Sequence, residues 1–259
     1  MRRVVELTEL GRGLGPRVLL LPGLGARGSG FRALAERLSE VARPVLVEYP
    51  EGRHAACGAG ELARQVLTAA GRMDAVVASS FGGMVAGHLA AAGAVRGVAF
   101  LGSFTRTEHL GLRGQAIAMM GPIAVLGRPG PLTAALASWK PIPFARVPEV
   151  VPTTSLERMS TLHRAFAIRR EPPPPDLRAL SVSCICIQGD RDVLVPASTM
   201  ERLAASLPPG TPRHLLRGAG HVPYFTHPEE CARLLTPWLG ALVPASQAAG
   251  GWHPRLVSA

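Results

Sequence analysis

The stretch Met73–Gly83, Met-Asp-Ala-Val-Val-Ala-Ser-Ser-Phe-Gly-Gly, joins an apolar, strand-like run directly to a helix-like segment of small residues. So tight a turn holds its central serine in a strained conformation with the hydroxyl exposed. Bulky side chains two positions before or after that serine would clash, and Ala78 and Gly82 stand there. Ser80 fits better than Ser79, because only Ser80 has a glycine two residues later. The turn therefore predicts Ser80 as a nucleophile, although an ordinary strand–turn–helix could also contain serines.

Strand-like and helix-like segments alternate on both sides of this turn. The expected strands are residues 17–22, 44–49, 73–79, 95–101, 183–188 and 213–216, and the expected helices are 31–41, 60–71, 81–92, 197–207 and 228–242. Continuous apolar strands are typical of a sheet that is buried on both faces. We therefore expect an α/β fold, with a mostly parallel sheet and helices on both of its faces.

The alternation stops between residues 104 and 180, where no strand is convincing. This part ends in the run Pro172–Pro175, which favours a stiff polyproline II segment and excludes helix. We expect residues 1–103 and 181–245 to form the core and residues 104–180 to form a helical cap (lid) inserted after the fourth main strand. Residues 246–259 are expected to be a loose tail.

Two further reactive residue types follow later strands, where ligand sites of such sheets lie. A serine hydroxyl needs a base to take its proton, and an acid can orient that base. The segment Gly189–Pro196 (GDRDVLVP) offers Asp192 as the acid, with Asp190 as an alternative that could instead close the turn. The segment Gly218–Pro223 (GAGHVP) offers His221 as the base. Serine, acid and histidine thus occur in the order expected for a strand–turn–helix nucleophile.

Two backbone amides are candidates for an oxyanion hole, which needs N–H groups aimed at the developing negative charge. One belongs to Phe81, directly after the serine, and the other to Leu24 in the glycine-rich loop after the first strand. That loop has a rival interpretation, because Gly23, Gly25 and Gly28 match the dinucleotide-binding spacing G-x-G-x-x-G and Glu48 ends the next strand. A nucleotide-binding role would leave the serine, acid and histidine unexplained.

From about Val18 to Leu242 the chain resembles the α/β-hydrolase superfamily. The segments LLPGLG, ASSFGG, GDRDVLVP and GAGHVPYFTHPEE are most similar to the pimeloyl-acyl carrier protein methyl ester esterase group. One departure is Pro22, which stands where a His-Gly start is common. The resemblance implies ester cleavage without a cofactor, and a role in biotin biosynthesis. An acyl thioesterase, or a non-hydrolytic member of the same fold, is the alternative.

The composition narrows the possible partners. The net charge is +10, but almost all of it is arginine spread along the chain, with Lys140 the sole lysine, so nucleic-acid binding is not expected. We expect a cytoplasmic location, because no signal peptide is visible and no apolar run approaches the roughly 20 residues of a membrane span. The cysteine spacing does not suggest a metal site. Cys184 and Cys186 alternate on one strand and should share a buried face.

The cap carries ten basic against five acidic residues. Arg158, Arg164 and Arg169 could lie on one helix, with Met159, Leu162 and Phe166 facing inward. These arginines are candidates for binding an acidic acyl carrier protein, or a substrate carboxylate or phosphate, because Arg forms paired hydrogen bonds with such groups. A solvated arginine-rich surface is the alternative. Met119 and Met120 are candidates for lining an acyl-chain pocket, or simply for packing the cap onto the core.

Overall fold

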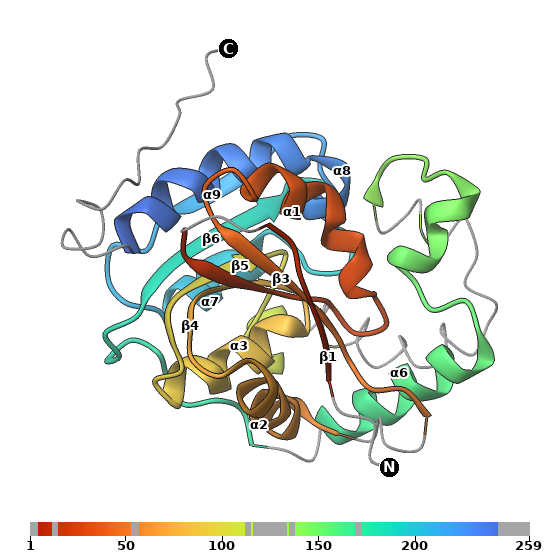
Figure 1. Cartoon of the computed structure of the whole chain (residues 1–259), viewed down its shortest axis with the longest axis horizontal. Coiled ribbons are helices and arrows are strands. Elements are labelled where there is room, and N and C mark those ends of the chain that lie inside the picture. Colours follow the sequence, from red (N-terminus) through yellow and green to blue (C-terminus); the bar gives the residue numbers. More distant parts are fainter. Residues whose placement is uncertain are drawn as a thin grey trace.

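A twisted sheet forms the centre of the computed structural model, which describes residues 5–11, 15–52, 57–111, 115, 134, 138–168 and 172–242 (Figure 1). Within these residues the sheet has seven strands in the order β1-β3-β2-β4-β5-β6-β7. The strands are β1 (Glu6–Glu9), β2 (Arg17–Leu21), β3 (Arg43–Glu48), β4 (Met73–Ser79), β5 (Val95–Leu101), β6 (Ser183–Gly189) and β7 (Arg213–Leu216). All neighbouring strands are parallel except β1, which is antiparallel to β3. The expected α/β fold is confirmed.

Helices cover both faces of this sheet (Figure 1). The α-helices are α1 (Arg32–Leu38), α2 (Ala59–Ala70), α3 (Gly82–Ala91), α6 (Ser155–Ile168), α7 (Ser198–Ala204), α8 (Pro223–Thr226) and α9 (Pro228–Leu242), and the 3-10 helices are η1 (Gly28–Phe31), η3 (Thr107–Leu110) and η4 (Phe144–Glu149). Helices α1 and α9 pack on one face, and α2, α3 and α7 on the other. Helix α6 lies to one side of the sheet, in the segment between β5 and β6.

Alternate residues of each central strand enter different cores. In β2, Leu19 and Leu21 pack with α2 and α3, whereas Val18 and Leu20 pack with α1 and α9. Successive side chains of a strand point to opposite faces, so a strand covered on both sides must be apolar at every position. The predicted shared face of Cys184 and Cys186 is confirmed, because both are buried in the core of α2 and α3.

Strand β1 was not predicted, because the first expected strand began at Arg17. Its sequence, Glu-Leu-Thr-Glu, is polar and mostly exposed. An edge strand is held mainly by backbone hydrogen bonds on one side, so it needs no apolar run. The segment 104–180 therefore follows the fifth strand of the sheet rather than the fourth.

The register aligns the carboxyl ends of four neighbouring strands. Ser79 pairs with Leu101, Leu101 pairs with Ile187, and Gly189 pairs with Leu216. The residues that follow β4, β5, β6 and β7 consequently emerge at the same edge of the sheet.

Two further features of the described residues are relevant to function. No helix there combines the length and apolar character needed to cross a membrane. The same residues contain no group of three or more His, Cys, Asp or Glu side chains placed to hold a metal ion.

Candidate active site

Ser80 lies between β4 and α3 with a left-handed backbone, at φ 51°. Three hydrogen bonds hold this conformation. The Ser80 amide donates to Leu101 O at 3.3 Å, and the Ser80 carbonyl accepts from Gly83 N at 3.0 Å and from the Ser103 hydroxyl at 2.6 Å. Such a conformation is unfavourable for a non-glycine residue, and it is characteristic of a serine at a sharp strand-to-helix turn.

Glycines at the start of α3 allow the close packing of this turn. A Cβ atom at Gly82 would lie 2.7 Å from Leu21 O, and one at Gly83 would lie 2.1 Å from the Ser103 hydroxyl. Neither position has room for a side chain. Sequence analysis identified the need for a small residue at position 82 but did not identify Ser103, because no pattern links a serine after β5 to the turn after β4.

Asp192 and His221 form a buried ion pair or hydrogen bond at the same edge of the sheet. His221 Nδ1 lies 2.8 Å from Asp192 Oδ2, and the Asp192 side chain is fully buried. The alternative acid, Asp190, is exposed and accepts a hydrogen bond from Gly218 N at 2.7 Å. Of the two aspartates, Asp192 therefore contacts the histidine, and Asp190 closes the loop that carries it.

The Asp192 carboxylate is fully supplied with donors. Its Oδ1 accepts the amides of Leu194 (2.9 Å) and Val195 (2.8 Å), and its Oδ2 accepts Gln188 Nε2 at 2.8 Å besides contacting His221. Four donors hold this carboxylate in one orientation. Gln188 was not predicted as a site residue, although a lone amide in the buried strand Ser-Cys-Ile-Cys-Ile-Gln was a signal for it, because buried polar groups need partners.

Gly102 lies between the backbone that holds Ser80 and the Asp192–His221 pair. The preceding residue, Leu101, accepts the Ser80 amide, and Gly102 itself donates to Ile187 O at 2.9 Å. A Cβ atom at Gly102 would lie 3.2 Å from Asp192 Oδ2 and 3.5 Å from His221 Nδ1. The structure thus brings the three predicted residues to one short stretch of the sheet edge.

The two predicted oxyanion donors border Ser80 from different sides. Phe81 follows it directly, and a Cβ atom at Gly23, next to Leu24, would lie only 3.1 Å from Ser80 Cβ. Among the described residues, the Leu24 and Phe81 amides donate to no protein acceptor. Both N–H groups therefore remain free for an oxygen placed next to the serine.

The loop that carries Leu24 is fastened to the N-terminus of α6. Arg27 donates to Glu157 Oε1 from Nε at 2.7 Å and also from Nη2. Glu157 also accepts the amides of Thr153 (2.8 Å) and Thr154 (2.7 Å). Burial alone would raise the pKa of Glu157, but the hydrogen bonds from Thr154, Arg27 and Thr153 outweigh it and hold the pKa at about 2. Glu157 is therefore an ionised clamp between α6 and the loop.

Helix α6 buries a polar face and exposes an apolar one. Glu157, Ser160, Thr161 and Arg164 are buried, whereas Leu156, Met159 and Phe166 are 45–55% exposed. The prediction that Met159 and Phe166 face inward is wrong, and only Leu162 of the three is buried. The polar face is turned inward because it meets two loops. In the loop after β3, Gly52 N donates to Ser160 Oγ at 2.8 Å and Pro50 O accepts from Arg164 Nη2, and in the loop after β2, Arg27 donates to Glu157.

The predicted substrate-binding residues between positions 104 and 180 differ in how deeply they are buried and in whether the structure describes them. Arg158 is half-buried and donates from Nη2 to Thr153 O at 2.6 Å. Arg164 is only 4% exposed, so the alternative of a solvated arginine does not apply to it, and it presents almost no surface to a carrier protein. Arg169, Met119 and Met120 lie outside the described residues.

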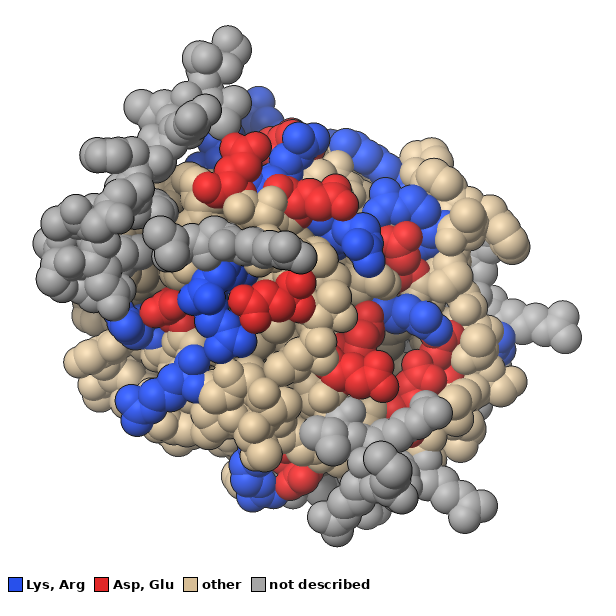
Figure 2. Space-filling model, viewed as in Figure 1, with Lys and Arg blue, Asp and Glu red and all other residues tan. Residues whose placement is uncertain are grey.

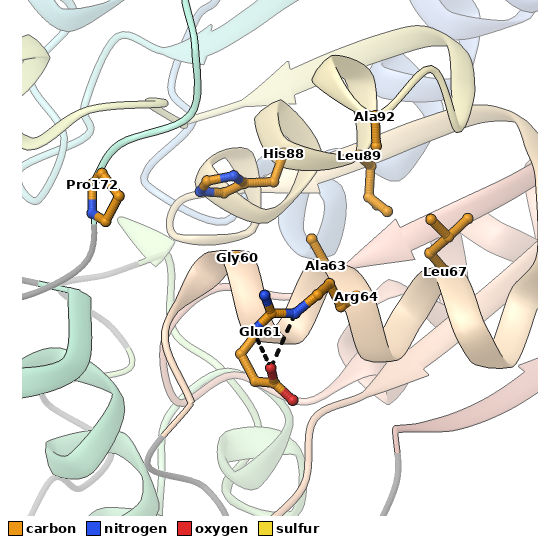
Figure 3. A pocket seen from close by; sticks show the side chains of 9 residues that line it. All are labelled: Gly60, Glu61, Ala63, Arg64, Leu67, His88, Leu89, Ala92 and Pro172. Carbon is orange, nitrogen blue, oxygen red and sulfur yellow. Dashed lines mark hydrogen bonds and ion pairs between the residues drawn. The ribbon is translucent and has the colours of Figure 1, made fainter.

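A separate hollow of about 330 Å³ lies between α2 and α3 (Figure 3). Its lining includes His88, Pro172 and Arg64, and the Arg64 side chain bends back to Glu61 in an ion pair. None of the predicted catalytic or oxyanion residues lines it, so this hollow is not part of the candidate active site.

The model of the α/β hydrolase family matches residues 18–234, so the chain belongs to that family. No curated protein sequence gives a significant match. Among solved structures, an esterase from Rhodococcus sp. is 21% identical, covers 92% of this chain and 95% of its own, and has a TM-score of 0.72.

Two further solved structures show the range of proteins with this fold. A thermophilic esterase from Thermogutta terrifontis, solved with malate bound, is 19% identical over 92% of this chain and 93% of its own, with a TM-score of 0.69. The epoxide hydrolase CorEH is 14% identical over 92% of this chain and 95% of its own, with a TM-score of 0.69. At such identities the likeness shows the fold alone, which carries several chemistries.

We predict that Gln188→Met weakens the support of Asp192. Removing one donor from a buried carboxylate should lower the free energy of unfolding by about 1–3 kcal/mol. The same change should slow fluorophosphonate labelling of Ser80 about tenfold, because the His221 ring loses part of its support. Urea denaturation and labelling kinetics measure both effects. Gln65→Met on α2 is the control, and equal effects of the two variants would contradict the proposed support.

We predict that Glu157→Gln loosens the clamp between α6 and the Leu24 loop. The pKa of Glu157 is depressed from 4.5 to about 2, so its stabilisation is present above about pH 4.5 and is lost as the pH falls toward 2. The stability gap between wild type and variant should therefore be about 1–3 kcal/mol at pH 7 and should shrink below pH 4.5. Glu229→Gln, which removes an exposed carboxylate that pairs with Arg37 and accepts a backbone hydrogen bond in the first turn of α9, should show a smaller gap. A gap that is constant with pH would contradict an ionised clamp.

Proposed function

We propose that the protein is a serine hydrolase that cleaves carboxylic esters through an acyl-enzyme, with Ser80 as nucleophile, His221 as base and Asp192 as the orienting acid. The observation that carries this proposal is the His221–Asp192 contact of 2.8 Å at the sheet edge where Ser80 is held at φ 51°. Family membership and the esterases among the structural neighbours support ester hydrolysis as the general reaction. The proposed reaction requires no cofactor.

In the proposed mechanism, His221 Nε2 takes the proton of the Ser80 hydroxyl as the serine oxygen attacks the ester carbonyl carbon. Asp192 holds the proton on Nδ1 and thereby leaves Nε2 as the acceptor. The Leu24 and Phe81 amides stabilise the oxyanion. The C–O bond to the alcohol then breaks, and the alcohol leaves with the proton from His221. Water repeats the sequence on the acyl-enzyme and releases the carboxylic acid.

A narrower proposal concerns the substrate and the cap. We propose that residues 104–180 form a cap over a core of residues 1–103 and 181–245, and that the substrate is the methyl ester of an acyl chain on a carrier protein. The similarity of four segments to the pimeloyl-acyl carrier protein methyl ester esterase group supports this substrate. Of the three candidate arginines, Arg158 and Arg169 remain for contact with an acidic carrier, because Arg164 is buried.

The surface charge limits where a carrier could bind. On the face in Figure 2, basic and acidic side chains are interspersed and do not form one basic area. Ion pairs among the described residues join Arg17 and Arg43 to Glu9, Arg37 to Glu229, Arg96 to Asp74, Arg146 to Glu149 and Arg213 to Glu201. Carrier binding in this proposal therefore depends on particular cap arginines rather than on the overall net charge.

We predict that Ser80→Ala abolishes catalysis. Hydrolysis of 4-nitrophenyl esters should fall by about three orders of magnitude or more, because the acyl-enzyme can no longer form. Labelling by a fluorophosphonate should disappear as well. Ser79→Ala is the matched control and should retain labelling, since Ser79 is buried at the end of β4. Persistent labelling of the Ser80 variant would identify a different nucleophile.

We predict that replacing Arg158 and Arg169 together by alanine selectively impairs carrier-bound substrates. The value of kcat/KM should fall about tenfold or more for a carrier-bound methyl ester and remain nearly unchanged for a small free ester, because only the former uses charge contacts on the cap. Arg37→Ala on α1 is the control. Equal losses on both esters would refute carrier docking. Cleavage of the carrier thioester instead of the methyl ester would identify a thioesterase.

A further inference from the structure

Arg164 is a buried cation without a carboxylate partner among the described residues. Its side chain is on the inner face of α6, and the residue is 4% exposed. Nη2 donates to Pro50 O, and Nε has no hydrogen-bond partner. The charges of Glu51 and Glu48 act on it, yet neither forms an ion pair with it. The Glu48 carboxylate instead accepts the Ser29 amide at 3.0 Å.

A second unsatisfied polar group lies next to this guanidinium. The Arg164 Cζ atom lies 5.5 Å from the centroid of the Tyr49 ring, and the buried Tyr49 hydroxyl also lacks a hydrogen-bond partner. Burial is the main influence on both groups: it lowers the pKa of Arg164 and raises the pKa of Tyr49. A guanidinium with an unpartnered Nε–H group therefore lies over the ring of a tyrosine whose hydroxyl is also unpartnered, and both groups are desolvated.

This pair is adjacent to the candidate active site. The Tyr49 ring packs edge-to-face on the Phe81 ring, with centroids 6.0 Å apart, and Phe81 follows the nucleophile. Arg164 is also one helical turn from Ser160 and Thr161, which contact the loops after β3 and β2. The Arg164 guanidinium thus contacts the Tyr49 ring, and the Tyr49 ring contacts the Phe81 ring next to Ser80. These contacts lie on the side where the proposed cap meets the sheet edge.

An uncompensated buried charge is costly, and leaving its donors unpaired adds to that cost. A purely structural link between α6 and the loop after β3 would not need an unpaired buried charge, because Ser160 already accepts the Gly52 amide. An anion bound from outside would supply both the missing charge and the missing acceptors. A carboxylate suits a guanidinium best in this setting, because its two oxygens match two N–H groups.

We propose that Arg164, with the Tyr49 hydroxyl, binds a carboxylate of the substrate, so that the preferred substrates are esters that carry a second, free carboxylate. This inference rests on the ester hydrolysis proposed above and is an alternative to the carrier-bound methyl ester, because an acyl chain with a methyl ester at one end and the carrier at the other has no free carboxylate. The free carboxylate belongs either to the acyl part or to the alcohol part of the ester, and the two cases are separated by the choice of substrate.

The test compares charged and neutral esters of matched length. For the acyl side, the pair is the mono-4-nitrophenyl ester of adipic acid and 4-nitrophenyl hexanoate. For the alcohol side, the pair is 4-carboxyphenyl hexanoate and phenyl hexanoate. Wild type should prefer the charged ester of one pair by about tenfold to a hundredfold in kcat/KM, the range expected for charge-assisted hydrogen bonds. Arg164→Met should lose that preference, and Arg164→Lys should keep part of it.

Matched controls separate binding from folding. Arg96→Met makes the same change at the start of β5, where an exposed arginine pairs with Asp74 at 3.4 Å, and should keep the full preference. Fluorophosphonate labelling shows whether each variant retains a competent Ser80. If Arg164→Met does not fold, the wild type still decides the question: hexanoate should inhibit it more strongly than the neutral hexanamide, and equal inhibition would refute the carboxylate site.

Each outcome has a separate meaning. If wild type cleaves the neutral and charged esters equally well, the carboxylate site is refuted while the proposed hydrolase function stands. Equal losses of Arg164→Met on both members of a pair would also refute it and leave Arg164 as a structural link. If wild type cleaves none of the four esters and is not labelled, the proposed function itself fails.

Discussion

The left-handed backbone of Ser80 is the constraint on which the rest of the site depends. A non-glycine residue at φ 51° costs about 1–3 kcal/mol and persists only when its surroundings enforce it. Here the amide and carbonyl of Ser80 are held by Leu101 at the end of β5, Gly83 in α3 and Ser103 in the loop after β5. Two of these hydrogen bonds join backbone groups, and the third comes from the Ser103 hydroxyl, so the packing around the sheet and one particular side chain together fix the position of Ser80.

The same sheet edge explains why three residue types far apart in the chain could be identified from sequence. Parallel strands end at a common edge, so a serine, an aspartate and a histidine that each follow a strand must emerge together. The apolar pattern of β4, β6 and β7 and the residues that follow these strands were therefore sufficient to predict that Ser80, Asp192 and His221 lie at one edge of the sheet, where the structure has them. Sequence alone left Asp190 open as the acid, because the choice depends on loop contacts such as the Asp190–Gly218 hydrogen bond.

The parts that sequence could not give are those held by contacts rather than by periodicity. Strand β1 is polar and at the edge, so no apolar pattern marks it. Gln188 and Ser103 act on the site through single hydrogen bonds across elements, with no spacing rule to reveal them. Helix α6 was predicted with the wrong side inward, because the usual assumption that apolar residues are buried fails where a helix covers the backbone of two loops.

That inverted helix links the substrate question to the geometry of catalysis. On one buried face, Glu157 fastens the loop of the Leu24 amide, and Arg164 reaches the loop of Tyr49. Glu157 is ionised and accepts hydrogen bonds from Arg27, Thr153 and Thr154, so its negative charge and the positive charge of Arg27 balance each other. Within the described part of the chain, Arg164 has one carbonyl acceptor and no carboxylate partner, so its charge is not balanced there. The proposed carboxylate site would use this unbalanced charge, which is separated from Ser80 by the rings of Tyr49 and Phe81, to discriminate between substrates by their charge.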